Sequence, residues 1–199
     1  MKKWILAIAL CLCAASAVAW MGPMMGGGVD SGAAGCTTLN DSLLVAFAEE
    51  PGTNNYPVSD TTWRAQIFRS GSGWTLTEYS LYLYDDGNGT ATFTASLYTT
   101  DGSHYPDSEV SDTAATVTGV ANSWGEYQLT LPSPKTGLSA TTEYAVVLRC
   151  SNSNGSWKRA ADGSGIANGY IAESSDSGAN WSGLYSNFAM VGDGVFGCE

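Results

Sequence analysis

The stretch LTEYSLYLYDDGNGTATFTASLY, residues 76–98, carries the clearest structural signal in the chain. In its first half, Tyr79, Leu81 and Leu83 fall on one face of an extended strand, and the residues between them fall on the other. The DDGNG segment at residues 85–89 is a strong turn signal, because Asp-Gly and Asn-Gly tolerate positive φ. The residues after it alternate again, so we expect residues 76–84 and 90–98 to pair as a β-hairpin.

Short segments of the same character recur along the chain, and no window shows a helical period. The run at residues 144–150 is nearly all apolar, which predicts a central strand covered on both faces. Many short strands separated by turns favour an all-β fold, a jelly-roll-like antiparallel β-sandwich forming a single domain over residues 39–199. The other predicted strands are residues 43–48, 65–68, 115–120, 127–131, 169–172 and 188–191.

The N-terminal residues indicate export. Lys2 and Lys3 precede an apolar run at residues 4–15, and Ala17-Val18-Ala19 supplies the small residues of a signal-peptidase site. The run is shorter than the roughly 20 residues that span a bilayer. We therefore expect a signal peptide at residues 1–19, a secreted or cell-surface protein, and no membrane insertion after cleavage. The Gly- and Met-rich segment at residues 20–38 is predicted to be a flexible leader.

The charge of the chain excludes one class of partner. The formal net charge is −11, with only eight Lys and Arg against nineteen Asp and Glu. Two of the eight basic residues are in the predicted signal peptide. Nucleic-acid binding needs a basic surface, so that function is excluded.

Three cysteines follow the predicted signal peptide. Export permits a disulfide, and Cys36 and Cys198 lie near the two ends of the predicted domain, so we favour a bridge between them. Cys150 lies in the apolar run and is predicted to be a buried thiol.

Several segments together resemble one protein family. They are AQIF at residues 65–68, WTLTEYSL at 74–81, ASLY at 95–98 with Asp101-Gly102 and Pro106, YQLT at 127–130 and LSATTEYAVVL at 138–148. Their order and spacing are similar to the choice-of-anchor R domains over residues 63–181, most of the mature chain. This resemblance implies a jelly-roll-like sandwich in exported bacterial proteins that usually carry a surface anchor, and it implies no known activity. The C-terminal residues GCE do not match such an anchor, which leaves attachment to a cell open.

A second motif is similar to the Asp-box, S-x-D-x-G-x-x-W, of sialidase propellers and other β-proteins. Here it consists of Ser174, Asp176, Gly178 and Trp181. We expect a structural role, in which the Asp caps backbone N–H groups, the Gly takes a positive φ and the Trp packs beneath a hairpin. Sialidases carry several boxes and an arginine cluster, whereas this chain has one box and few arginines. A glycoside hydrolase fragment is therefore the least favoured interpretation.

The sequence offers little catalytic machinery. His104 is the only histidine, it lies in a loop that we expect to be exposed, and the chain has no G-x-S-x-G motif. The paired carboxylates occur mainly in turns, where solvent keeps them ionised. We therefore predict a non-catalytic protein.

Two groups of residues are candidate sites. Exposed aromatic rings beside amide and carboxylate groups could bind a glycan, although each ring could instead close the core. Turn oxygens could bind calcium, the one candidate cofactor, although such turns also form without a metal. The sequence thus predicts an exported module with a surface structural, adhesive or binding role, whose partners are glycans or surface proteins, and a carbohydrate-binding module is the alternative. The aromatic candidates are Tyr82, Tyr84, Trp124 and Trp157, and the calcium candidates are Asp60, Asp85, Asp86 and Asn88.

Overall fold

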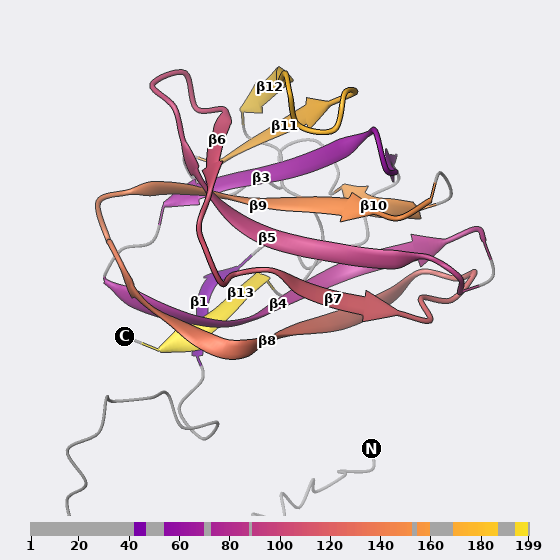
Figure 1. Cartoon of the computed structure of the whole chain (residues 1–199), viewed down its shortest axis with the longest axis horizontal. Helices are drawn as coiled ribbons and strands as arrows, with labels where there is room; N and C mark the ends of the chain where they lie inside the picture. Colours follow the sequence, from indigo (N-terminus) through magenta and orange to yellow (C-terminus); the bar gives the residue numbers. More distant parts are fainter. Residues whose placement is uncertain are drawn as a thin grey trace, which may run out of the picture. The chain divides into compact units, whose positions relative to one another are not determined.

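The computed structural model describes residues 42–46, 54–69, 73–87, 89–152, 155–159, 169–186 and 194–198. Every regular element in these residues is a β-strand, and all strand pairs are antiparallel, which confirms the predicted all-β fold (Figure 1). The strands are β1 Ser42–Ala46, β2 Asn54–Val58, β3 Trp63–Arg69, β4 Trp74–Asp85, β5 Thr92–Thr100, β6 Pro106–Glu109, β7 Ala115–Thr118, β8 Gly125–Leu138, β9 Glu143–Cys150, β10 Gly155–Arg159, β11 Tyr170–Ser174, β12 Ser182–Ser186 and β13 Gly194–Cys198.

These strands form the two sheets of a β-sandwich. The first sheet has the order β1-β13-β4-β10-β2, and β8 pairs with the other edge of β4. The second sheet has the order β12-β11-β3-β9-β5-β6, and β7 also pairs with β5. Figure 1 shows β3, β9 and β5 in one layer above β4 and β8. Because β3, β4 and β5 alternate between the sheets, and β8, β9 and β10 do so again, the connectivity is jelly-roll-like.

The predicted hairpin between residues 76–84 and 90–98 is wrong. β4 and β5 lie in different sheets, and the turn between them carries the chain from one sheet to the other. The carboxylate of Asp85 accepts hydrogen bonds from the backbone N–H groups of Gly87 at 2.8 Å and Ala91 at 3.1 Å, which fixes this turn. The apolar faces of the two strands then meet across the core. An alternating pattern with a turn is equally consistent with a hairpin and with such an arch.

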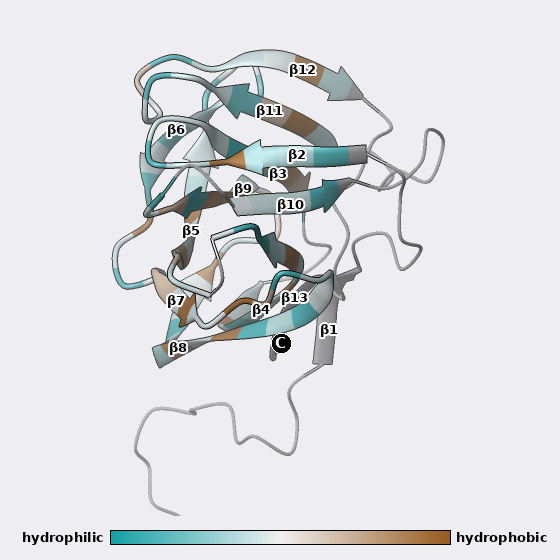
Figure 2. Ribbon diagram, turned by 90° about the vertical axis from the view of Figure 1, so that its right-hand side faces the viewer, coloured by the Kyte–Doolittle hydropathy of each residue, from teal (hydrophilic) through white to brown (hydrophobic). Residues whose placement is uncertain are grey.

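The core fills the space between the sheets, and a second apolar cluster covers the outer face of the second sheet. β9 contributes to both, because Val146 and Leu148 belong to the core whereas Ala145 and Val147 belong to the outer cluster. This confirms that residues 144–150 form a central strand buried on both faces. In Figure 2 the hydrophobic stretches, in brown, lie along inner strands such as β9 and β11, whereas the edge strand β2 is mostly hydrophilic.

All of the described strands belong to one compact unit, Gly35–Glu199. The predicted signal peptide, the whole of the predicted leader, and the predicted strand at residues 188–191 lie outside the described residues. Within the described part of the chain, no helix is long and apolar enough to span a membrane.

Candidate functional site

Three aromatic side chains form a patch on the outer face of the first sheet, which we call the aromatic patch: Tyr82, Tyr84 and Trp124. Tyr82 and Tyr84 alternate along β4 with Leu81 and Leu83, which are fully buried in the core, so the two tyrosines point away from it. All three rings are partly exposed. The Tyr82 and Trp124 rings are nearly parallel, with an interplanar angle of 9° and centroids 6.1 Å apart, and Tyr84 lies 5.3 Å from Trp124 at 33°.

Polar groups border the aromatic patch. The Tyr84 hydroxyl lies 3.0 Å from Asn122 Oδ1 and 3.3 Å from Asp86 Oδ1, and Asn122 Nδ2 donates to Asp86 at 3.4 Å. Desolvation and the nearby charge of Asp86 raise the pKa of the Tyr84 phenol above its ordinary value, so its hydroxyl stays protonated and can donate. The Lys158 amine lies 5.3 Å from the Tyr82 centroid and 5.2 Å from that of Trp124, a cation–π geometry.

The fold holds this patch in place. The loop that carries Trp124 is tied at Ala121, whose carbonyl accepts from Asp85 N at 3.1 Å and whose N–H donates to Tyr127 Oη at 2.8 Å. Trp124 is followed at once by β8, where Gly125 pairs with Leu83 of β4. The patch is therefore built on two paired strands and a bonded loop, so little ordering is needed before a ligand binds.

Trp157 was the fourth aromatic candidate, and that prediction is wrong. Its side chain is fully buried in the core, and it is the largest such side chain among the described residues. Successive residues of β10 point to opposite faces, so Trp157 points inward and Lys158 points to the patch. The short segment GSWKR has one apolar residue, which is too few to reveal from the sequence whether Trp157 faces the core or the solvent.

The three calcium candidates that the structure describes do not form a cluster of metal ligands there. Asp85 is fully buried and caps the turn between β4 and β5, and Asp86 faces Tyr84 and Asn122. Asp60 is exposed in the loop between β2 and β3, and Asn88 lies outside the described residues. Among the residues that the structure describes, no three His, Cys, Asp or Glu side chains form a group that could hold a metal ion.

The predicted Asp-box lies in the turn between β11 and β12. Asp176 Oδ1 accepts from Asn180 N and from Ser174 Oγ, both at 2.8 Å, and Asp176 Oδ2 accepts from Asn180 Nδ2 at 2.6 Å. Gly178 has a φ of +83°, and a Cβ there would lie 2.6 Å from the Trp63 ring. Trp181 packs against the outer cluster of the second sheet. These contacts fold the turn onto the protein.

Acid should loosen this turn. The hydrogen bonds from Asn180, and then the one from Ser174, lower the pKa of Asp176 below its ordinary value. A lowered folded-state pKa stabilises the turn at pH above the unfolded value, and this contribution is lost as pH falls through the folded value. Amide hydrogen exchange should show less protection at Gly178 and Asn180 in acid than at neutral pH. An Asp176→Asn variant that kept the wild-type pH profile would contradict this.

The structure describes the side chain of one of the three cysteines that follow the predicted signal peptide. Cys150 is a buried free thiol, as predicted; it donates to Asn152 Oδ1 at 3.3 Å, and burial raises its pKa. The favoured bridge cannot be placed, because Cys36 and the side chain of Cys198 lie outside the residues described in atomic detail. That bridge stays a prediction.

No protein-family model matches the chain, and a search of curated proteins gives no significant match. The choice-of-anchor resemblance therefore stays an expectation from the sequence. The aromatic patch is the arrangement that best supports a function. Lys158 and Asn122, which the sequence analysis missed, complete it. Lys158 could have been found as the outward-facing neighbour of Trp157 on β10, whereas Asn122 lies in the loop before Trp124 and has no such signal.

Proposed function

We propose that this chain is an exported, non-catalytic β-sandwich module that binds carbohydrate on the aromatic patch. One observation carries the proposal: the rings of Tyr82 and Trp124 lie on the outer face of a sheet and are nearly parallel, with an angle of 9° between their planes. Such rings offer a rigid apolar surface against which the C–H face of a sugar ring packs, at little cost in side-chain entropy. Binding a glycan on a cell or matrix surface would itself serve adhesion.

The rim supports the same ligand class. Asn122, Asp86 and the Tyr84 hydroxyl provide donors and acceptors for sugar hydroxyls at the edge of the rings. Lys158 supplies a further donor over them. An apolar surface bordered by a few fixed polar groups is typical of a small-molecule site, where the polar groups orient the ligand. A signal-like N-terminus and the acidic composition support the proposed location outside the cell.

A glycan array followed by calorimetry on any sugar that binds tests the proposal. The Trp124→Ala variant should bind about 10- to 100-fold more weakly, because removing an aromatic residue from the centre of a site costs roughly 1.5–3 kcal/mol. The change leaves the core intact, so circular dichroism should be that of the wild type.

Tyr185→Ala is the matched control for a Tyr82→Ala variant. Tyr185 lies on β12 of the second sheet and is 41% exposed, so its removal should leave sugar binding unchanged. A wild-type protein that binds no glycan, or a Trp124→Ala variant that binds as the wild type does, would contradict the proposal.

A further inference from the structure

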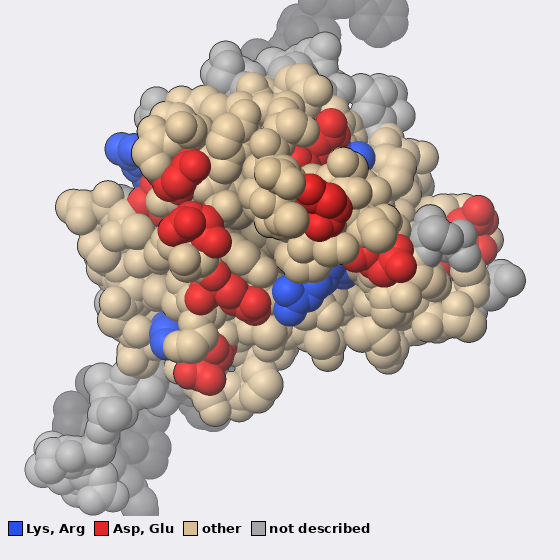
Figure 3. Space-filling model, turned by 45° about the horizontal axis from the view of Figure 1, so that its top comes forward, with Lys and Arg blue, Asp and Glu red and all other residues tan. Residues whose placement is uncertain are grey.

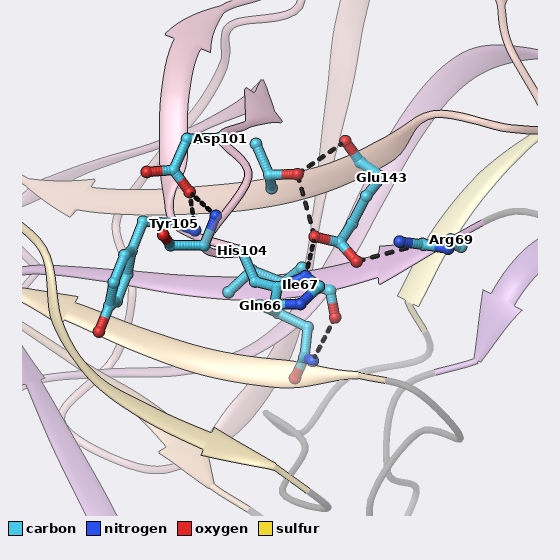
Figure 4. A network of polar contacts seen from close by, with 9 residues as sticks. Gln66, Ile67, Arg69, Asp101, His104, Tyr105 and Glu143 are labelled. Atoms are coloured by element: carbon cyan, nitrogen blue, oxygen red, sulfur yellow. Dashed lines mark hydrogen bonds and ion pairs between the residues drawn. The ribbon is translucent and has the colours of Figure 1, made fainter.

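A second site lies on the outer face of the other sheet. It is a pocket of about 260 Å³ lined by Arg69, His104, Glu143 and Tyr170, which come from the end of β3, the loop before β6, the start of β9 and the start of β11. Figure 4 shows the contacts of Glu143 with His104 and Arg69. The aromatic patch faces outward from the first sheet, so a single ligand molecule cannot occupy both sites. The volume of the pocket is below the roughly 300–1,000 Å³ of pockets for drug-sized ligands, which restricts its occupant to a small molecule or group.

A buried carboxylate organises this pocket. The Glu143 side chain is only 7% exposed. Its Oε1 lies 2.8 Å from His104 Nδ1 and accepts from Thr100 Oγ1 at 3.0 Å, and its Oε2 accepts from Arg69 Nε at 3.2 Å. Both oxygens are therefore engaged, and the carboxylate fixes an imidazole and a guanidinium side by side.

Hydrogen bonds to Asp101 also fix the loop around His104. Asp101 Oδ1 accepts from the backbone N–H groups of Ser103 at 2.7 Å and Tyr105 at 2.9 Å. His104 has a φ of +70°, a left-handed conformation that is unfavourable for a non-glycine residue. Its ring stacks on Tyr170, with centroids 4.8 Å apart and an interplanar angle of 21°, and together with the Glu143 contact this stacking offsets the cost. The imidazole is thus positioned rather than free.

What remains in the pocket is the donor fork of Arg69 beside the His104 ring. Glu143 engages Arg69 through Nε and His104 through Nδ1, while the terminal Nη atoms of Arg69 have no partner among the described residues. The side chains of Arg69 and His104 are 57% and 37% exposed. The two Nη atoms of a guanidinium match the two oxygens of a carboxylate.

We propose that this pocket binds the carboxylate of a small acidic molecule, with the Arg69 Nη pair as donors and the rings of His104 and Tyr170 as walls. The chain is strongly acidic overall, and Figure 3 shows acidic side chains spread over one face with few basic ones between them. That field repels a polyanion, whereas one carboxylate at an arginine fork gains short-range, charge-assisted hydrogen bonds. The proposal rests on these contacts alone and is independent of sugar binding at the aromatic patch.

His104 provides a direct test, because it is the only histidine of the chain and its ring signals need no assignment. The full exported chain would be titrated by NMR with glucuronate, with N-acetylglycine and with glucose. We expect saturable shifts of the imidazole signals with glucuronate and none with glucose. A response to N-acetylglycine as well would show that a carboxylate suffices, and a response to glucuronate alone would identify an acidic sugar. No saturable shift with either acid, or an equal shift with glucose, would overturn the proposal.

The Arg69→Gln variant separates this site from the general charge of the protein. We expect at least a tenfold loss of affinity for the acid that binds, and a smaller loss for Arg69→Lys, which keeps the charge without the fork. Arg149→Gln is the matched control: Arg149 lies on the same strand as Glu143 but six residues away, about 20 Å along β9. The proposal fails if Arg69→Gln binds like the wild type, or if Arg149→Gln loses as much affinity.

Discussion

Replacing Trp157 by alanine should destabilise the fold by about 3–5 kcal/mol, the range for removal of a large aromatic side chain from a core. Trp157 is fully buried, and in the first sheet it pairs with Leu83 of β4 on one side and Tyr56 of β2 on the other. The neighbouring packing is tight: a Cβ on Gly155 would lie 2.7 Å from Cys150 Sγ. A core packed this closely cannot fully collapse into the space that the indole leaves. Urea denaturation would measure the loss.

Trp124→Ala is the control for this measurement, because it is the same chemical change at a partly exposed ring. Trp124 stacks on Tyr82 and contacts the tilted ring of Tyr84, so its loss should cost about 1 kcal/mol. The two variants thus assign one tryptophan to stability and the other to binding. Equal losses of stability, or a loss below about 1 kcal/mol for Trp157→Ala, would contradict the assignment.

The sequence predicted the strands that carry a long alternating or continuous apolar pattern. The segments around Leu81, Phe93, Leu129 and Val146 are of this kind, and each forms a strand. The strands that were missed are short and give too few positions to establish a period. Examples are β6, whose sequence is PDSE, and β12, whose sequence is SGLYS. β2, β6 and β12 are also sheet edges, where hydrophilic residues and proline are tolerated.

The candidate site residues were likewise predictable only where they lie in a strand with a long alternating pattern. Tyr82 and Tyr84 could be placed on the outer face because they alternate with Leu81 and Leu83 in the second half of β4. The contact between His104 and Glu143 could not be predicted, since 39 residues separate them and only the pairing of β5 with β9 brings them together. A loop histidine in a sequence is indistinguishable from one held by a buried carboxylate.

Replacing Asp85 by alanine should destabilise the protein by about 3 kcal/mol, because it removes two charge-assisted hydrogen bonds. The Asp85 carboxylate is fully buried and caps Gly87 N and Ala91 N. Ala91 is itself fully buried, so without the carboxylate its N–H loses its acceptor away from water. Urea denaturation gives the global loss, and faster hydrogen exchange at Gly87 and Ala91 would locate it in the turn.

Asp86→Ala is the neighbouring control, since Asp86 is exposed and, among the described residues, bonds only to side chains at the rim of the aromatic patch. Its loss should cost less than about 1 kcal/mol of stability. Asp85→Asn should fall between, because the amide oxygen can still accept from Gly87 while the amide nitrogen faces a second donor at Ala91. If all three variants were equally stable, the buried carboxylate would not be what directs the chain from one sheet to the other. The order Asp86→Ala, Asp85→Asn, Asp85→Ala, from least to most destabilised, would show that this one carboxylate selects the arch over the hairpin that the same sequence pattern also allows.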